Sequence, residues 1–192
     1  MKEPTAAQLA TYRQAIIELQ SQVDFTYTWT VQDSTSTFVL EDIPSDLAIL
    51  TMYVSAETDD STFTQQPALH FQVNADSSLG YTFRYSYING AGWSSALWTE
   101  RQDNTYRGFC GAMKSQVSGS VPTTSEVTFG NWGIGSGDLC YTGHVNNAIQ
   151  NGLVGGHCDV SLIPRPYTSL TLIPAVGNFI AGSTFTVVGR YP

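Results

Sequence analysis

The clearest hydrophobic pattern lies in residues 169–189, near the carboxyl end. Leu170 and Leu172 alternate with threonine, and the same alternation returns in residues 184–188. Apolar residues at every second position are typical of a half-buried β-strand. Glycine and asparagine at 177–182 supply turn residues between the two segments. We therefore expect a strand pair that completes an all-β body.

The same period of two recurs along most of the chain from residue 25 onward. Residues 47–55 are instead almost continuously apolar, which predicts a strand buried on both faces. Frequent turns between short strands are typical of a sandwich or jelly roll. We predict a jelly-roll-like antiparallel β-sandwich with a short N-terminal α-helix. The expected strands are residues 25–31, 38–43, 47–55, 68–74, 81–87, 106–112, 114–118, 126–129, 140–145, 157–163, 169–174 and 184–188.

Only the first 24 residues follow a helical pattern. Residues 5–8, Thr-Ala-Ala-Gln, form a capping box, so a helix is expected from about residue 6 to residue 23. Its apolar positions follow a heptad spacing. They are Leu9, Tyr12, Ile16, Leu19 and Val23. Residues 1–24 would therefore dock on the β-sandwich of residues 25–192, or form an oligomer interface in a homotrimer.

The composition favours a protein that works in an assembly. The chain has 192 residues, of which 42% are hydrophobic and only 12% are charged. Its polar surface must therefore be built mainly from threonine, serine, asparagine and glutamine. A net charge of −8 with two lysines is not the basic surface that nucleic-acid binding requires.

The sequence offers no targeting or disulfide signal. No run approaches 18 apolar residues, so no membrane span is expected, and the first residues lack the apolar core of a secretion signal. Three cysteines are too few for a disulfide framework, so reduced thiols are expected.

We find no set of residues with the spacing of a catalytic, metal or cofactor site. Cys140, His144, His157 and Cys158 have the residue types of a zinc site. However, neighbouring residues on a strand point to opposite faces, so His157 and Cys158 could not easily share one ion. The carboxylates are scattered, and the pair at 59–60 is expected to be solvated. Phosphate-binding glycine loops are missing. The prediction is therefore no enzyme, no metal and no cofactor.

Three aromatic residues, Tyr87, Trp93 and Trp98, lie in or near an expected loop that is rich in serine, glycine and asparagine. Aromatic side chains in such a segment can stack on a glycan or anchor a protein partner. Alternatively, they plug the end of the β body or contact a neighbouring subunit.

Three patches resemble a β module of tailed-bacteriophage virion proteins. Residues 38–45 resemble its F-x-x-I-P strand, and the apolar residues 47–55 follow. Residues 69–81 resemble its fN-x-D-x-x-x-x-Y strand and turn. Residues 169–189 resemble its terminal nf-aGS-x-f-x-l-y-G strand, with Val188 in place of the usual tyrosine. The resemblance implies a virion structural protein with a jelly-roll-like fold, commonly trimeric and without catalytic residues.

Three functions follow as hypotheses. The first is a capsid decoration protein, of the cement or head-fibre type, that binds the major capsid protein or another virion protein. The second is a tail-fibre or receptor-binding protein that recognises a host surface glycan. The third is a small non-phage lectin or glycan-active enzyme. Under the first two, the protein is located in the virion, which is assembled in the host cytoplasm.

Overall fold

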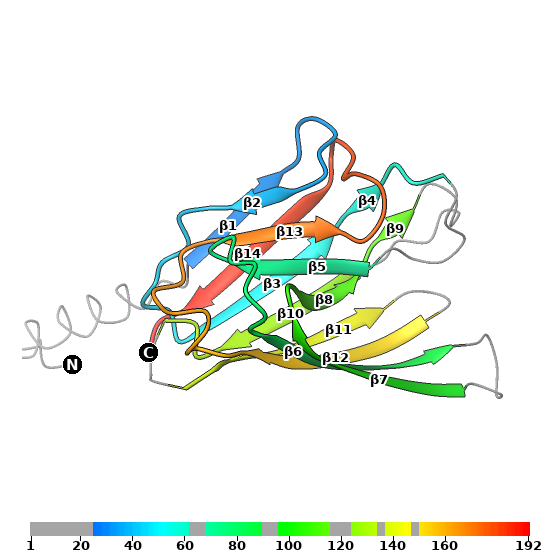
Figure 1. Cartoon of the computed structure of the whole chain (residues 1–192). Helices are drawn as coiled ribbons and strands as arrows, with labels where there is room; N and C mark the ends of the chain where they lie inside the picture. Colours follow the sequence, from blue (N-terminus) through cyan, green and yellow to red (C-terminus); the bar gives the residue numbers. More distant parts are fainter. Residues whose placement is uncertain (1–24, 62–67, 90–95, 116–123, 134–136, 147–149) are drawn as a thin grey trace, which may run out of the picture.

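The computed structural model describes residues 25–61, 68–89, 96–115, 124–133, 137–146 and 150–192, so the helix expected in residues 1–24 lies outside it. The regular structure in these ranges is β-strand (Figure 1). The strands are β1 (Phe25–Thr30), β2 (Phe38–Leu40), β3 (Ile49–Ser55), β4 (Glu57–Thr58), β5 (Ala68–Val73), β6 (Tyr81–Asn89), β7 (Ala96–Thr105), β8 (Gly108–Ala112), β9 (Lys114–Ser115), β10 (Thr124–Gly130), β11 (Leu139–Asn146), β12 (Gln150–Cys158), β13 (Leu170–Pro174) and β14 (Thr184–Arg190).

Two antiparallel sheets make up the body of the described chain. The large sheet has eight strands in the order β1-β14-β3-β10-β11-β12-β6-β7, and the small sheet has the order β2-β13-β5-β8. A short parallel pair, β4 with β9, lies apart from both sheets in the pairing (Figure 1). The predicted all-β antiparallel sandwich is confirmed.

Eight of these strands have the connectivity of a jelly roll. They form four nested antiparallel pairs, β1 with β14, β2 with β13, β3 with β10, and β5 with β8. A long antiparallel ribbon that is folded over once gives this nesting, and winding the ribbon places alternate pairs in two facing sheets. The first and third pairs lie in the large sheet, and the second and fourth form the small sheet.

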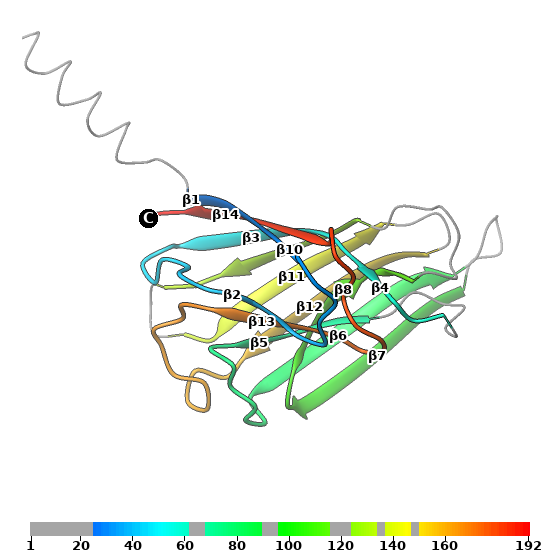
Figure 2. The same cartoon turned by 90° about the horizontal axis from the view of Figure 1, so that it is seen from above.

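Two hairpins are inserted into this jelly roll. The β6–β7 hairpin lies between β5 and β8 in sequence, and the β11–β12 hairpin lies between β10 and β13. They pair with each other through β12 and β6, and β11 pairs with β10. The hairpins therefore extend the large sheet by four strands beyond the jelly roll (Figure 2).

Aromatic rings fill the space between the two sheets. Phe71, in β5 of the small sheet, meets the rings of Phe129 at 5.1 Å and Tyr141 at 4.9 Å, both edge-on and both from the large sheet. Tyr81 closes the cluster at 5.8 Å from Phe71. These side chains are at most 2% exposed, so the core is continuous across the two layers.

Two of the resembling patches hold turns at one end of the sandwich. Asn74 adopts a left-handed backbone, with φ of 50°. Its Oδ1 accepts hydrogen bonds from the backbone N–H groups of Thr168 at 2.9 Å and Ser169 at 3.2 Å, just before β13. The Tyr81 hydroxyl accepts one from the N–H of Val73 at 2.9 Å and donates to the carbonyl of Asp76 at 3.1 Å. These residues therefore serve the fold.

The carboxylate of Asp59 has a structural partner, which corrects the expectation of a solvated charge pair. Its two oxygens accept hydrogen bonds from the backbone and side chain of Asn178, at 2.7 and 3.0 Å. These bonds lower the pKa of Asp59 because they favour the charged form. They also fasten the turn at Gly177, whose φ of 70° suits glycine.

The glycine-rich loop that follows β10 contributes a core residue. Trp132 is fully buried, and its indole N–H donates to the carbonyl of Pro44 at 3.1 Å. Next to it, the N–H of Gly133 donates to the carbonyl of Leu47 at 2.8 Å. A Cβ atom on Gly133 would lie 1.8 Å from the carbonyl oxygen of Ser45, so this close approach requires glycine.

Three strand predictions were wrong in detail. The last two strands do not pair with each other, because β13 lies in the small sheet and β14 in the large one. Strand β3 is buried on one face only, since Ile49 is 40% and Tyr53 46% exposed. The strand expected at 157–163 instead spans Gln150–Cys158, and it includes Asn151 and Gly152, whose turn residue types predict a loop.

Candidate functional site

The predicted site residues fall partly outside the described chain. The heptad positions Leu9, Tyr12, Ile16, Leu19 and Val23 lie in residues 1–24, and Trp93 lies in residues 90–95. Tyr87 and Trp98 are described, and they are direct partners in the antiparallel register of β6 and β7. The prediction that Trp98 belongs to a loop segment is therefore wrong, because it lies within a ten-residue strand.

The four residues considered for zinc are divided between the two faces of the large sheet. Cys140 and His157 are register partners on β11 and β12, whereas Cys158 is fully buried on the other face. Burial raises the pKa of the Cys158 thiol well above its usual value, which makes it an inert core group. His157 instead lies 4.0 Å from the carboxylate of Asp138. Among the described residues, no three metal-ligating side chains form a group.

The outer face of the large sheet, which we define as the face turned away from the small sheet, is lined by threonine. The hydroxyls of Thr28 and Thr186 are 2.9 Å apart, and those of Thr51 and Thr128 are 3.1 Å apart. Both pairs bridge neighbouring strands. Threonine favours strands, and its hydroxyl has little conformational freedom. The outer face of the four jelly-roll strands β1, β14, β3 and β10 is therefore polar and rigid.

One row of register partners crosses this outer face from edge to edge. It passes from the jelly-roll strands into the inserted hairpins, and its members are opposed strand by strand. In sheet order the row is Thr28, Thr186, Tyr53, Glu126, His144, Leu153, Ser86 and Thr99. The middle of the row carries a phenol, a carboxylate and an imidazole side by side, and Leu153 next to them is 63% exposed.

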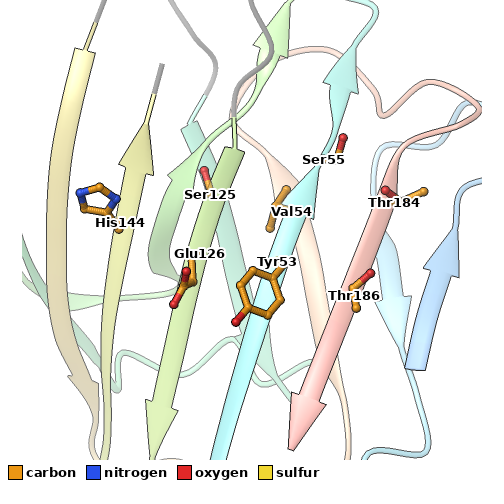
Figure 3. A pocket seen from close by; sticks show the side chains of 8 residues that line it. All are labelled: Tyr53, Val54, Ser55, Ser125, Glu126, His144, Thr184 and Thr186. Carbon is orange, nitrogen blue, oxygen red and sulfur yellow. The ribbon is translucent and has the colours of Figure 1, made fainter. Parts of the chain in front are cut away.

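A shallow pocket of about 380 Å³ lies over the middle of this row. Figure 3 shows Glu126 between Tyr53 and His144, each from a neighbouring strand, with Thr186 beyond Tyr53. Val54, Ser55, Ser125 and Thr184 complete the lining. The pocket lies where the jelly roll meets the β11–β12 insertion. Its aromatic ring and polar groups suit recognition of a polar partner.

A second pocket, of about 430 Å³, lies on the small sheet beside the β7–β8 connection. His70 and Arg107 line it, together with Gln72, which donates to the carbonyl of Tyr106 at 3.0 Å. Burial, and then the charge of Arg107, lower the pKa of His70 to about 4. His70 is therefore neutral at physiological pH, and its role is in packing.

Sequence reasoning missed the first pocket for a physical reason. Tyr53, Glu126 and His144 are far apart in the sequence, and only the register of three strands brings them together. Each one alone fits an ordinary exposed strand position. The one available signal was that residues at every second position of a strand share a face. Tyr53 and Glu126 each lie between two buried residues, so both had to point outward.

Comparison with known proteins gives little. No protein-family model matches the chain, and no curated protein matches its sequence. A solved structure of the infectious bursal disease virus VP2 subviral particle is similar at 14% identity, over 88% of this chain and 42% of that chain, with a TM-score of 0.12. The structure of the Gx strain of that virus gives 13% identity, the same coverages and a TM-score of 0.14.

Both structures are of viral particles, and at TM-scores of 0.12 and 0.14 the similarity does not establish a shared fold or function. The chain also spans less than half the length of the two VP2 chains. In the part of the chain that is described, no helix is both long and apolar enough to cross a membrane.

Proposed function

We propose that this chain is a structural protein of a tailed-bacteriophage virion, and that it decorates the capsid as a homotrimer. The main support for the proposal is the jelly-roll nesting of four strand pairs, β1 with β14, β2 with β13, β3 with β10, and β5 with β8. Jelly rolls are frequent in viral capsid and lectin domains, so this step is an analogy of fold. The resemblance of three sequence patches to phage virion proteins points to the first of these two classes.

The chemistry of the described residues supports a role in contact. Asn74, Asp76 and Tyr81 are part of the resembling patches, and their side chains hold turns together by accepting hydrogen bonds from backbone N–H groups. The threonine-lined outer face is broad, and it holds a shallow pocket over its middle row. We assign this outer face to the contact with the capsid, because short threonine side chains on a rigid sheet lose little conformational entropy when they are buried.

The test is binding to capsids. Purified protein is added to expanded capsids that lack it, and co-sedimentation is quantified against the number of capsomers. We expect saturation at a fixed number of copies per capsomer. Thr128→Lys and Thr142→Lys should weaken binding because each places a charge on the contact face. Leu162→Lys is the matched control, since Leu162 is 47% exposed and lies in a turn away from that face. Absence of saturable binding would contradict the proposal.

A tail-fibre role is the second candidate, favoured by the pairing of Tyr87 with Trp98. Two aromatic residues at opposed positions of one hairpin can present a stacking surface to a sugar. This role predicts binding to host cells that Trp98→Ala or Trp93→Ala abolishes. Capsid binding would be unaffected by these substitutions, so the two roles are distinguishable.

A lectin or glycan-active enzyme unrelated to phage is the third candidate. The pocket on the outer face offers one carboxylate, Glu126, whereas most glycosidases use two facing carboxylates. The lining therefore favours binding over hydrolysis, and we propose that the chain is not an enzyme. Glycan turnover that Glu126→Gln removes would overturn this view.

A further inference from the structure

Strand β1, at one edge of the large sheet, lacks the features that usually protect an exposed edge. Natural edge strands carry lysine, proline or a bulge, which prevent pairing with another chain. β1 reads Phe-Thr-Tyr-Thr-Trp-Thr, with no charge, proline or glycine. Its register with β14 is regular over its whole length. Within the described ranges, no strand pairs with its other side.

The opposite edge strand, β7, shows the contrast. Its ten residues include Glu100, Arg101 and Asp103, and its register with β6 shifts between Tyr81 and Phe83. Charges and a register shift are both known protections of sheet edges. The same sheet therefore has one protected edge and one unprotected edge, and the unprotected one requires a partner.

The hydrogen bonds of Val31, which follows β1, indicate which residues of β1 direct their backbone N–H and C=O groups away from β14. The N–H of Val31 donates to the carbonyl of Ser183 at 2.9 Å, and the Val31 carbonyl accepts from Gly182 at 2.9 Å. Val31 therefore directs both of its groups toward the neighbouring chain segment. Because this direction alternates along an antiparallel strand, Thr26, Thr28 and Thr30 direct theirs outward.

The side chains of β1 are self-complementary. From Tyr27 outward in either direction, the strand reads threonine and then an aromatic residue, Phe25 on one side and Trp29 on the other. Phe25 and Trp29 are half-buried, whereas Tyr27 is 54% exposed. A two-fold interface requires a surface that matches itself. The order aromatic, threonine, Tyr27, threonine, aromatic reads the same in both directions and meets this requirement. A second copy of this chain is therefore the partner that the pattern fits.

We propose that β1 pairs antiparallel with β1 of a second copy, across a two-fold axis at Tyr27. In this register Thr26 lies opposite Thr28 of the second copy, and their outward backbone groups form the hydrogen bonds. The aromatic residues of both copies lie on one face and the threonines on the other. The pairing joins the two large sheets into one. It is a two-fold contact, separate from the three-fold contact of the proposed homotrimer, so it would link one trimer to another. It is independent of the proposed virion role, and a protein without that role could still pair in this way.

A disulfide at the axis tests the register. Tyr27 would face its own copy in a pair that is not hydrogen-bonded, where Cα atoms lie about 4.5 Å apart, within the reach of a disulfide. In a Cys140→Ser background, Tyr27→Cys should give a covalent dimer under mild oxidation on a non-reducing gel. Tyr53→Cys is the matched control, because Tyr53 is 46% exposed but lies on β3, which is not an edge strand. Equal cross-linking of the two variants would overturn the proposal.

A charge at the axis tests the contact itself. Tyr27→Lys would place two ammonium groups directly opposite each other, so the dissociation constant should rise roughly tenfold or more. Sedimentation equilibrium of the full chain should show this loss of self-association, and Tyr53→Lys should not cause it. Circular dichroism checks that both variants fold. An unchanged mass for Tyr27→Lys would overturn the pairing and leave capsid binding untouched.

Discussion

The two faces of the large sheet use the same strands but different chemistry. On β3, the inward residues Leu50, Met52 and Val54 are buried, whereas Thr51 and Tyr53 between them lie on the outer face. The inward face meets a second sheet, and the outer face meets none of the described strands. Stability therefore depends mainly on the inner face, and the outer face is left available for contact.

Substitution in the shared core should have the largest effect. Phe71→Ala removes a fully buried ring that meets three others, so it should lower the free energy of unfolding by about 3–5 kcal/mol. Urea denaturation measures the loss. Phe71→Leu is the control, with a smaller loss, because it keeps most of the apolar volume. An equal loss for both would mean that ring packing is unimportant.

Acid should weaken the sandwich through His70, an outward residue that is only partly exposed. His70 has a pKa of about 4 in the folded protein against 6.5 unfolded. The unfolded chain therefore binds the proton first, so stability falls as pH drops from about 6.5 to about 4, by roughly 3 kcal/mol in total. Thermal unfolding across this range measures the slope. His70→Gln should flatten it, and an unchanged slope would contradict the assignment.

A close backbone contact at the end of the sandwich should tolerate no side chain. Gly133→Ala would press its Cβ against the Ser45 carbonyl, so the free energy of unfolding should fall by about 1–3 kcal/mol. Gly137→Ala is the control, because no atom lies within 4 Å of its Cβ position. Differential scanning fluorimetry should separate the two variants, and equal midpoints would be evidence against the tight contact.

The turn held by Asn74 should show a smaller loss. Asn74→Gly keeps a backbone that accepts the φ of 50° but removes the acceptor for two N–H groups, and we expect a loss of about 1 kcal/mol. Asn74→Asp keeps that acceptor, but it replaces the 2.7 Å bond to the Pro166 carbonyl with an unfavourable contact between two oxygens, which the exposed site partly relieves. Chemical denaturation should rank the wild type first, then Asp, then Gly.

The outer face should be the least sensitive to substitution. Thr51→Val removes one hydroxyl from the pair with Thr128 and keeps the side-chain shape. Because this pair is only partly buried, the free energy of unfolding should change by less than about 0.5 kcal/mol. The same variant in the capsid-binding assay then separates contact from stability. A loss as large as that of Phe71→Ala would remove the distinction between the two faces.

The all-β fold was predictable because apolar and polar residues alternate in the sequence of many strands. Strands such as Phe25–Thr30 and Thr184–Arg190 show this alternation directly in their letters. The exposed face of β3 was not predictable, because Ile49 and Tyr53 are apolar and point outward. Asn151 and Gly152 in β12 suggested a loop, since both residue types are common in turns. Gly156 lies so close to the Tyr141 hydroxyl that a Cβ would be 2.5 Å from it, which only the packed structure reveals.

The candidate site was less predictable than the fold. Tyr87 and Trp98 were singled out, and the structure places them opposite each other, but the residues of the outer pocket were not. Period-two patterns indicate which face a residue occupies, while the order of strands in a sheet depends on long-range pairing. The row of Tyr53, Glu126 and His144 depends on that order, so a single sequence could not supply it.

The nested pairing of the strands also has a consequence for synthesis on the ribosome. Phe25 must wait for Gly189, and Leu40 for Leu170, before either can join its sheet. At about 5–20 residues per second, this delay lasts roughly 8–30 s. During that time the aromatic residues of β1 are exposed on the nascent chain. The native sheet therefore cannot close before its last strand has been made, and β1 must avoid premature association until then.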